Sequence, residues 1–125
     1  LAALQTQIAL GHKDFYQFNL SSLDLQKLNL NGAILIRANL SQANLSEADL
    51  SKSTTNGATL SEANLIGAKL RTTNASWTTL RGANLCEANL FRAKLSWSNL
   101  TGAKLIKAVL IDAKLNKTNL RSNYA

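Results

Sequence analysis

The chain lacks proline and methionine, and its 125 residues include only one cysteine and one histidine. A lone cysteine excludes an internal disulfide and cannot by itself form a structural zinc site. Aromatic residues make up 6% of a chain that is 46% hydrophobic, so its core must be aliphatic. No run of 18 apolar residues occurs, which excludes a membrane-spanning helix. No signal-peptide pattern opens the sequence, and a cytoplasmic location is favoured.

The residue types that usually act in catalysis, such as His, Cys, Asp and Glu, do not form a recognisable motif in the sequence. His12 has no partner in view, so a surface or capping role is favoured over that of a base. Cys86 has no second cysteine and no nearby histidine, which favours an inert, small hydrophobic side chain. The seven acidic residues are scattered, and no glycine-rich phosphate loop is present. The sequence therefore predicts a protein that is not an enzyme and that holds no cofactor or metal.

A leucine recurs at every fifth residue, as in "RANLSQANLSEADLS" at residues 37–51. From 20 to 120, Leu occupies 19 of the 21 multiples of five, with Thr55 and Ala75 as the exceptions. Ala stands two residues earlier in 13 of the 21 units, and Asn or Asp stands one residue earlier in 12. A step of five would scatter the leucines around a helix or alternate them across a flat strand. Since the leucines must share one environment, the spacing predicts a coil with one short side per unit.

In this coil the Leu and the small residue two positions earlier both point inward, because strand faces repeat every two residues. Asn and Asp suit the bend, since their side chains can bond nearby backbone groups. Rare residues recur at intervals of 20, which predicts four units per coil. The residues that match at this interval are Thr55 and Ala75; Trp77 and Trp97; Ile66, Cys86 and Ile106; and Phe91 and Ile111.

These tandem units resemble the pentapeptide-repeat family, whose consensus is A(D/N)LXX, and the resemblance covers residues 14–122. It implies an all-β fold, a right-handed quadrilateral β-helix with four pentapeptides per coil and about five coils. The Leu-rich and Asn-rich units are similar to those common in cyanobacteria. One branch of the family mimics DNA and protects gyrase with a strongly acidic rod, and the basic charge of this chain argues against that role.

Three segments are expected along the chain: an N-terminal cap over 1–13, the repeat β-helix over 14–122, and a C-terminal tail over 123–125. Apolar residues at helical spacing before Gly11 predict a short helix that ends at this glycine.

The C-terminal tail offers no comparable cap, so the last coil, near Leu115 and Leu120, is expected to expose an unpaired backbone edge. Such an edge predicts a homodimer in which two identical ends meet.

The two positions at which another residue replaces the recurring Leu, Thr55 and Ala75, should be neighbours on one wall of the coil. The inward residues beside them, Ser53 and Thr73, are larger than Ala, so mutual compensation of volume is favoured over a local pocket.

Charge is unevenly distributed along the chain, whose net charge is +7. Residues 1–62 hold four basic and five acidic residues, a net charge of −1, whereas residues 63–125 hold ten basic and two acidic residues, a net charge of +8. Exposed aromatic and apolar side chains flanked by cations often mark recognition surfaces. The predicted interaction surface comprises Trp77, Trp97, Arg71, Arg92, Lys94, Lys114, Lys117, Ile66, Ile106, Phe91 and Ile111.

Two functions remain open at this point. The favoured one is a non-catalytic structural module that presents a rigid rod to an unidentified protein partner. The alternative is sequence-tolerant binding of nucleic acid or another polyanion through the basic C-terminal half, since the chain has no helix suited to enter a groove. Charge that serves only solubility is the simplest account of the same residues.

Overall fold

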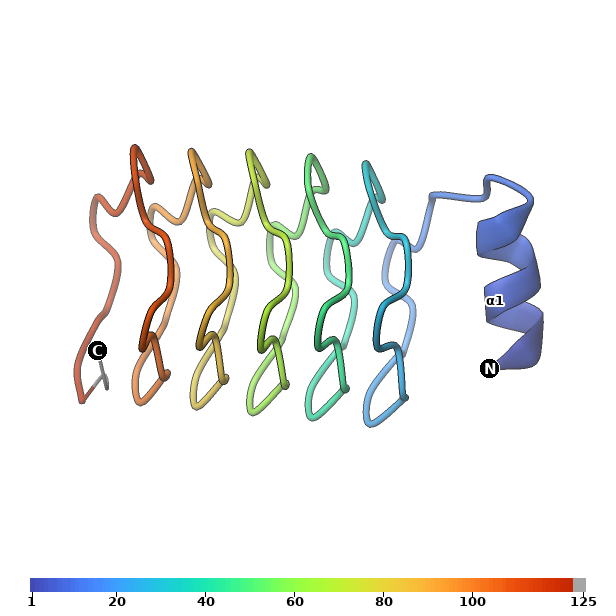
Figure 1. Cartoon of the computed structure of the whole chain (residues 1–125), viewed down its shortest axis with the longest axis horizontal. Coiled ribbons are helices and arrows are strands. Elements are labelled where there is room, and N and C mark those ends of the chain that lie inside the picture. The colour runs from blue at the N-terminus through green and yellow to red at the C-terminus, as the bar shows by residue number, and fades with distance from the viewer. Residues whose placement is uncertain (123–125) are drawn as a thin grey trace.

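The protein consists of one short helix and a stack of similar coils, as seen in a computed structural model (Figure 1). The structure describes residues 1–122, and the expected tail, 123–125, lies outside the described residues. The helix α1 spans Ala2–Ala9 and lies across the N-terminal end of the stack. The coils follow one another along the long axis of the molecule, so residues close in sequence are also close along the rod.

Each coil contains four units, because every described bridge is parallel and joins a residue to its equivalent four units later, from Asp14↔Ile34 to Asn99↔Asn119. The predicted register is thus confirmed. The bridges are isolated, so no extended strand occurs within residues 1–122. The first two residues after each Leu form the corner, which leaves room for only one bridged residue per side.

Hydrogen bonds between coils start from three residues in each unit: the inward residue, the residue just before it, and the second residue after it, as from the Arg37 N–H to the Asn56 carbonyl at 3.0 Å. The Leu35 N–H donates to the Thr54 carbonyl at 2.8 Å, while the Ile34 N–H donates back to the Lys13 carbonyl at 2.7 Å. This alternation repeats around the coils and satisfies backbone groups that burial would otherwise leave unpaired.

Every corner contains a residue with left-handed backbone. At each turn the N–H of the third residue after Leu returns to the Leu carbonyl, as from Ala33 to Leu30 at 3.0 Å. The second residue after the inward Leu or Phe has positive φ in every unit from Gln17 to Ser122, and most of these residues are not glycine. Positive φ at this position alone is typical of a type II turn. The sequence did not predict this conformation, which ordinarily costs about 1–2 kcal/mol for a residue other than glycine.

The Asn and Asp residues that stand just before an inward residue stabilise the same corners. All 13 of them, from Asp14 to Asn119, accept a hydrogen bond from the backbone N–H two residues later, at 2.9–3.4 Å. These bonds confirm the predicted role of Asn and Asp at the bend.

The core consists of leucine columns with alanine beside them, and it contains Phe15 in the first coil. Leu85, in a middle coil, is fully buried, as are Ala83 and Ala88 on either side of it in sequence. Small side chains fit there because they lie next to the corners, where the backbone approaches itself.

Helix α1 is terminated, as predicted, by Gly11, which lies two residues beyond its last helical residue and has φ of +87°. The Gly11 N–H donates to Ile8 and the His12 N–H donates to Gln7, both at 2.9 Å, which is the Schellman arrangement. Ile8 is the one buried residue of α1, and Phe18 in the first coil remains 43% exposed. The helix therefore covers the first coil only in part.

The opposite end is more open. Leu100 is buried, whereas Leu115 is half-buried and Leu120 is 43% exposed. The homodimer expected through this last coil stays a prediction.

We expect Leu85→Asp to unfold the protein. The substitution places a carboxylate in an apolar column, at a cost of about 4 kcal/mol or more, which is comparable to the stability of a small domain. Glu87→Ala changes an exposed corner residue two positions later and should leave the melting temperature nearly unchanged. Thermal unfolding followed by circular dichroism compares the two, and equal melting temperatures would contradict the inward placement of Leu85.

Candidate interaction surface

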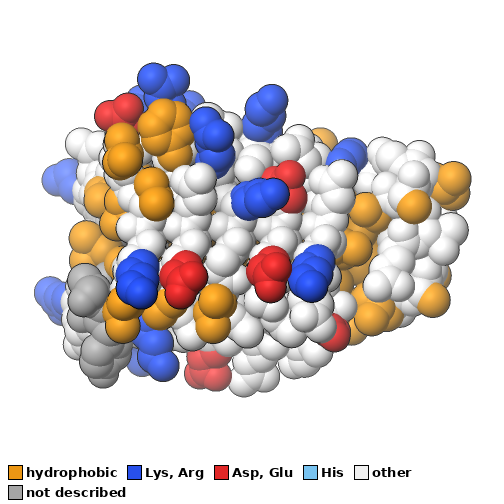
Figure 2. Space-filling model, in the orientation of Figure 1, with side chains coloured by type: hydrophobic (Ala, Val, Ile, Leu, Met, Phe, Trp, Pro, Cys, Tyr) orange, Lys and Arg blue, Asp and Glu red, His pale blue; other side chains and the backbone are white. Residues whose placement is uncertain are grey.

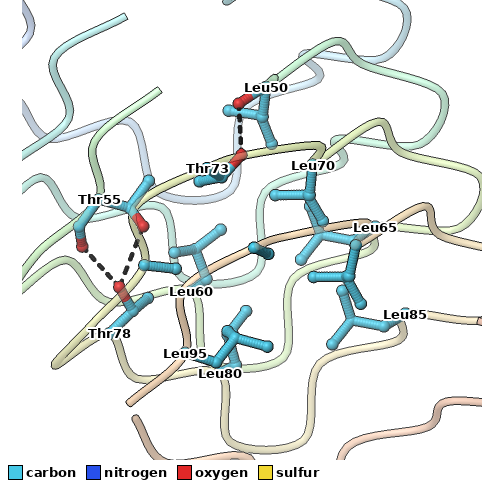
Figure 3. A pocket seen from close by; sticks show the side chains of 13 residues that line it. Leu50, Thr55, Leu60, Leu65, Leu70, Thr73, Thr78, Leu80, Leu85 and Leu95 are labelled. Atoms are coloured by element: carbon cyan, nitrogen blue, oxygen red, sulfur yellow. Dashed lines mark hydrogen bonds between the residues drawn. The ribbon is translucent and has the colours of Figure 1, made fainter. Parts of the chain in front are cut away.

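The wall that carries Thr55 and Ala75 in place of the recurring Leu contains almost no empty space. A void of about 10 Å³ remains inside the coil, lined by leucines and by Thr55, Thr73, Ala75 and Thr78 (Figure 3). A volume this small is at the lower limit for one water molecule, and its lining surface is apolar, so it is not a ligand site. The result agrees with the expected compensation of volume.

Buried threonine hydroxyls replace part of the missing leucine contacts. Thr73 Oγ1 donates to the Leu50 carbonyl at 2.8 Å, and Thr78 Oγ1 donates to the Thr55 carbonyl at 2.7 Å (Figure 3). Thr78 Oγ1 also lies 3.0 Å from Thr55 Oγ1. Ser53 Oγ, by contrast, is buried without a hydrogen-bond partner. Neither the threonine network nor this unpaired hydroxyl was predicted.

Trp77 and Trp97 form a parallel stack on one corner of the rod. Their ring centroids are 5.0 Å apart and the ring planes differ by 1°. The indoles are 60% and 51% exposed, so the predicted stack is confirmed and most of its surface meets solvent. The separation matches the spacing of about 4.8 Å between hydrogen-bonded strands, so the coil register holds the rings in place.

Cations lie within and beside this corner. We define the tryptophan corner as Trp77, Trp97 and Lys117. Lys117 Nζ lies 5.8 Å from the centroid of Trp97, within the range of a cation–π contact. Lys94 and Lys114 are bridged neighbours on the adjoining wall, and both are exposed. The two lysines lie one coil apart and both carry a positive charge, so this wall has a positive potential and the two side chains repel each other.

The next corner along the rod's circumference, which we define as the arginine corner, consists of Arg71, Phe91 and Arg92. The two guanidinium carbons lie 5.0 and 5.1 Å from the centroid of Phe91. Arg92 also forms an ion pair with Asp112 at 3.7 Å, and both side chains are more than 60% exposed. Solvent screens this exposed pair, so Arg92 remains available to an incoming anion.

Exposed apolar side chains are seen toward the C-terminal end of the face in Figure 2, and again around α1 at the N-terminal end. Ile66 is 38% exposed, Ile106 48% and Ile111 63%, as expected from their outward positions. Val109, also 38% exposed, was not among the residues predicted for this surface, although Lys94 and Lys114, which stand at the equivalent position just before Leu, were. Val109 stands just before Leu110, at the bridged position that faces outward between two corners.

Groups suited to catalysis or metal binding do not converge within residues 1–122. No cluster of three or more His, Cys, Asp or Glu side chains occurs there. His12 packs edge-on against Phe15, with ring centroids 5.2 Å apart. No helix in this part of the chain has the length and apolar character needed to cross a bilayer.

A repeat solenoid with aromatic and charged residues aligned along its corners is the class of protein that this geometry defines. The profile of the family described as pentapeptide repeats (8 copies) matches residues 14–51, 38–74, 68–105 and 88–122. The chain belongs to the pentapeptide-repeat family, whose members form right-handed quadrilateral β-helices and are generally non-catalytic structural modules.

Two solved cyanobacterial structures are similar to this chain. The pentapeptide repeat protein Rfr23 of Cyanothece 51142 is 27% identical over 99% of each chain, with a TM-score of 0.91. The pentapeptide repeat protein alr5209 of Nostoc PCC 7120 is 35% identical over 83% of this chain and 79% of its own, with a TM-score of 0.56. No curated protein matches the chain.

We expect Ser53→Ala to raise the free energy of unfolding by about 1 kcal/mol, since it removes a buried hydroxyl without a partner. Thr78→Val should lower it by about 1–3 kcal/mol, because the shape is kept while the hydrogen bonds to Thr55 are lost. Urea unfolding measures both. A stabilising Thr78→Val would show that the threonine network does not support the wall.

Proposed function

We propose that this chain is a non-catalytic interaction module, a right-handed quadrilateral β-helix that presents a rigid rod to a protein partner. The parallel stack of Trp77 and Trp97 is the observation that supports it most directly. Exposed tryptophans are costly to leave in water and are enriched among residues that dominate binding energy.

The chemistry of the partner follows from what surrounds the stack. Lys117 places positive charge beside Trp97, and Lys94 and Lys114 add positive charge on the adjoining wall. A partner that combines an apolar contact with Asp or Glu side chains at its rim would complement this surface. Because the indoles are already held in register, binding would immobilise few side chains, which lowers its entropic cost.

We expect the double substitution Trp77→Ala and Trp97→Ala to abolish partner capture without unfolding the rod, because both indoles are exposed. Affinity capture from the native cell extract, with mass spectrometry and a circular dichroism check of folding, compares the variant with the unmodified chain. Tyr16→Ala is the matched control, since Tyr16 is an aromatic residue with 46% exposure in the first coil. A partner retained equally by both variants would contradict a role for the stack.

Binding of nucleic acid or another polyanion is the second candidate. It is favoured by the guanidinium groups of Arg71 and Arg92 over Phe91, since aromatic rings and cations together support bases and phosphates. The lysines at 94, 114 and 117 would continue this surface to the tryptophan corner.

Charge reversal to Glu at these five cations should abolish binding to single-stranded or duplex nucleic acid, with little change in stability. The five residues are Arg71, Arg92, Lys94, Lys114 and Lys117. Fluorescence anisotropy at several salt concentrations measures the affinity, which should fall steeply as salt rises.

Reversal of five cations elsewhere provides the control with the same net charge. These residues are Lys27, Arg37, Arg81, Lys104 and Lys107. Equal loss in both variants, or no binding by the unmodified chain at low salt, would exclude this second function.

A further inference from the structure

A shallow hollow of about 410 Å³ lies beside the arginine corner, near the middle of the rod. Its lining consists of three cationic and two hydroxyl side chains, namely Lys52, Lys69, Arg71, Ser51 and Thr72. No acidic side chain is among them.

Coil stacking brings these residues together from two separate stretches of sequence. Ser51 and Lys52 occupy the same corner positions in one coil that Arg71 and Thr72 occupy in the next coil. Lys69 is the outward residue of the wall that leads to this corner. Lys52 belongs to the half of the chain with net charge −1, so the division of charge along the sequence conceals the cluster.

Within residues 1–122, the lysine head groups at this hollow have no ion-pair partner. The one ion pair shorter than 4 Å in this part of the chain joins Arg92 and Asp112, and no hydrogen bond engages Lys52 Nζ or Lys69 Nζ. Three like charges around one hollow repel one another, an arrangement that an anion would relieve.

Asp49, the bridged neighbour of Lys69, is the nearby acid that has to be considered. It accepts hydrogen bonds from the Ser51 N–H at 2.9 Å and from Asn31 Nδ2 at 3.5 Å. Burial acts to raise the pKa of Asp49, but these bonds and the charge of Lys69 outweigh it and hold the pKa below its ordinary value. Asp49 therefore stays ionised and offsets one of the three positive charges, which leaves a positive excess.

The lining matches the chemistry of a tetrahedral oxyanion. The planar guanidinium of Arg71 can donate two parallel hydrogen bonds, and the ammonium groups of Lys52 and Lys69 can donate from other directions. The hydroxyls of Ser51 and Thr72 border the same space, but Thr72 Oγ1 already donates to the Arg71 carbonyl at 2.7 Å, so the three cations are the donors on which the proposal rests. A dianion gains more from three cations than a monovalent carboxylate does.

We propose that this hollow binds a phosphate dianion, supplied as inorganic phosphate or as the phosphate group of a monoester. The proposal concerns residues separate from the tryptophan corner, so it stands or falls independently of the protein-interaction role. The hollow is open to solvent on one side, so the carbon group of a small monoester can extend out of it.

The test is a titration of the whole chain with sodium phosphate at pH 7.5 and constant ionic strength, followed by ¹H–¹⁵N NMR. The amide signals of residues 51, 52, 69, 71 and 72 should shift with saturation. O-phosphoserine in a second arm tests the monoester, and tighter binding than inorganic phosphate would identify the monoester as the favoured source. Sodium acetate should leave the signals almost unchanged.

The informative variant is Lys52→Gln with Lys69→Gln, which should weaken phosphate binding roughly tenfold or more through loss of two charge-assisted contacts. Lys104→Gln with Lys107→Gln is its matched control. Lys104 is a bridged wall residue like Lys69, and Lys107 is a corner residue with φ of 61° where Lys52 has 62°. Binding should survive in this control.

Two results would overturn the proposal. One is the absence of a saturable shift with either phosphate compound. The other is equal weakening in the two double variants, which would mean that the positive charge of the whole rod attracts phosphate without a local site.

Discussion

The coil-to-coil backbone hydrogen bonds determine which residues of this protein are neighbours. An inward Leu donates its N–H to a carbonyl of the next coil, as Leu35 does to Thr54, and the residue before it donates to the preceding coil, as Ile34 does to Lys13. Together these bonds fix a register of four units per coil. Any slip of the register would move leucines away from leucines, and buried backbone groups would lose their partners.

The same register decides the chemistry of the surface. It brings Trp77 and Trp97 face to face and sets the guanidinium of Arg71 over Phe91. It also places Lys94 beside Lys114, where their mutual repulsion is a cost that the core leucines must outweigh. A solenoid of this kind can tolerate such arrays, because its core lies in the inward columns and its outward positions carry little of the packing energy.

Local conformation at the corners illustrates the limit of sequence reasoning. The Asn and Asp positions could be assigned to the bend, because their side chains form short-range bonds that depend only on nearby backbone. The left-handed residue two positions after Leu could not, since residues such as Thr72 and Trp77 ordinarily avoid positive φ. The turn must close within a single unit, and the hydrogen bonds to both adjacent coils outweigh the local strain at this position.

The sequence by itself determined the inward columns, the four units per coil, the helix that ends at Gly11 and the stacking of the two tryptophans. Each of these follows from a regular spacing or a local signal that can be read along the chain. Only the tertiary structure decided the rest: the pairing of Thr55 with Thr78 and the hollow that joins Lys52 to Lys69. These features join positions that are offset from the regular coil interval, or depend on how side chains fill space across a corner. The repeat specifies the lattice of backbone positions, whereas the contacts between side chains depend on their shapes and directions at each point of it.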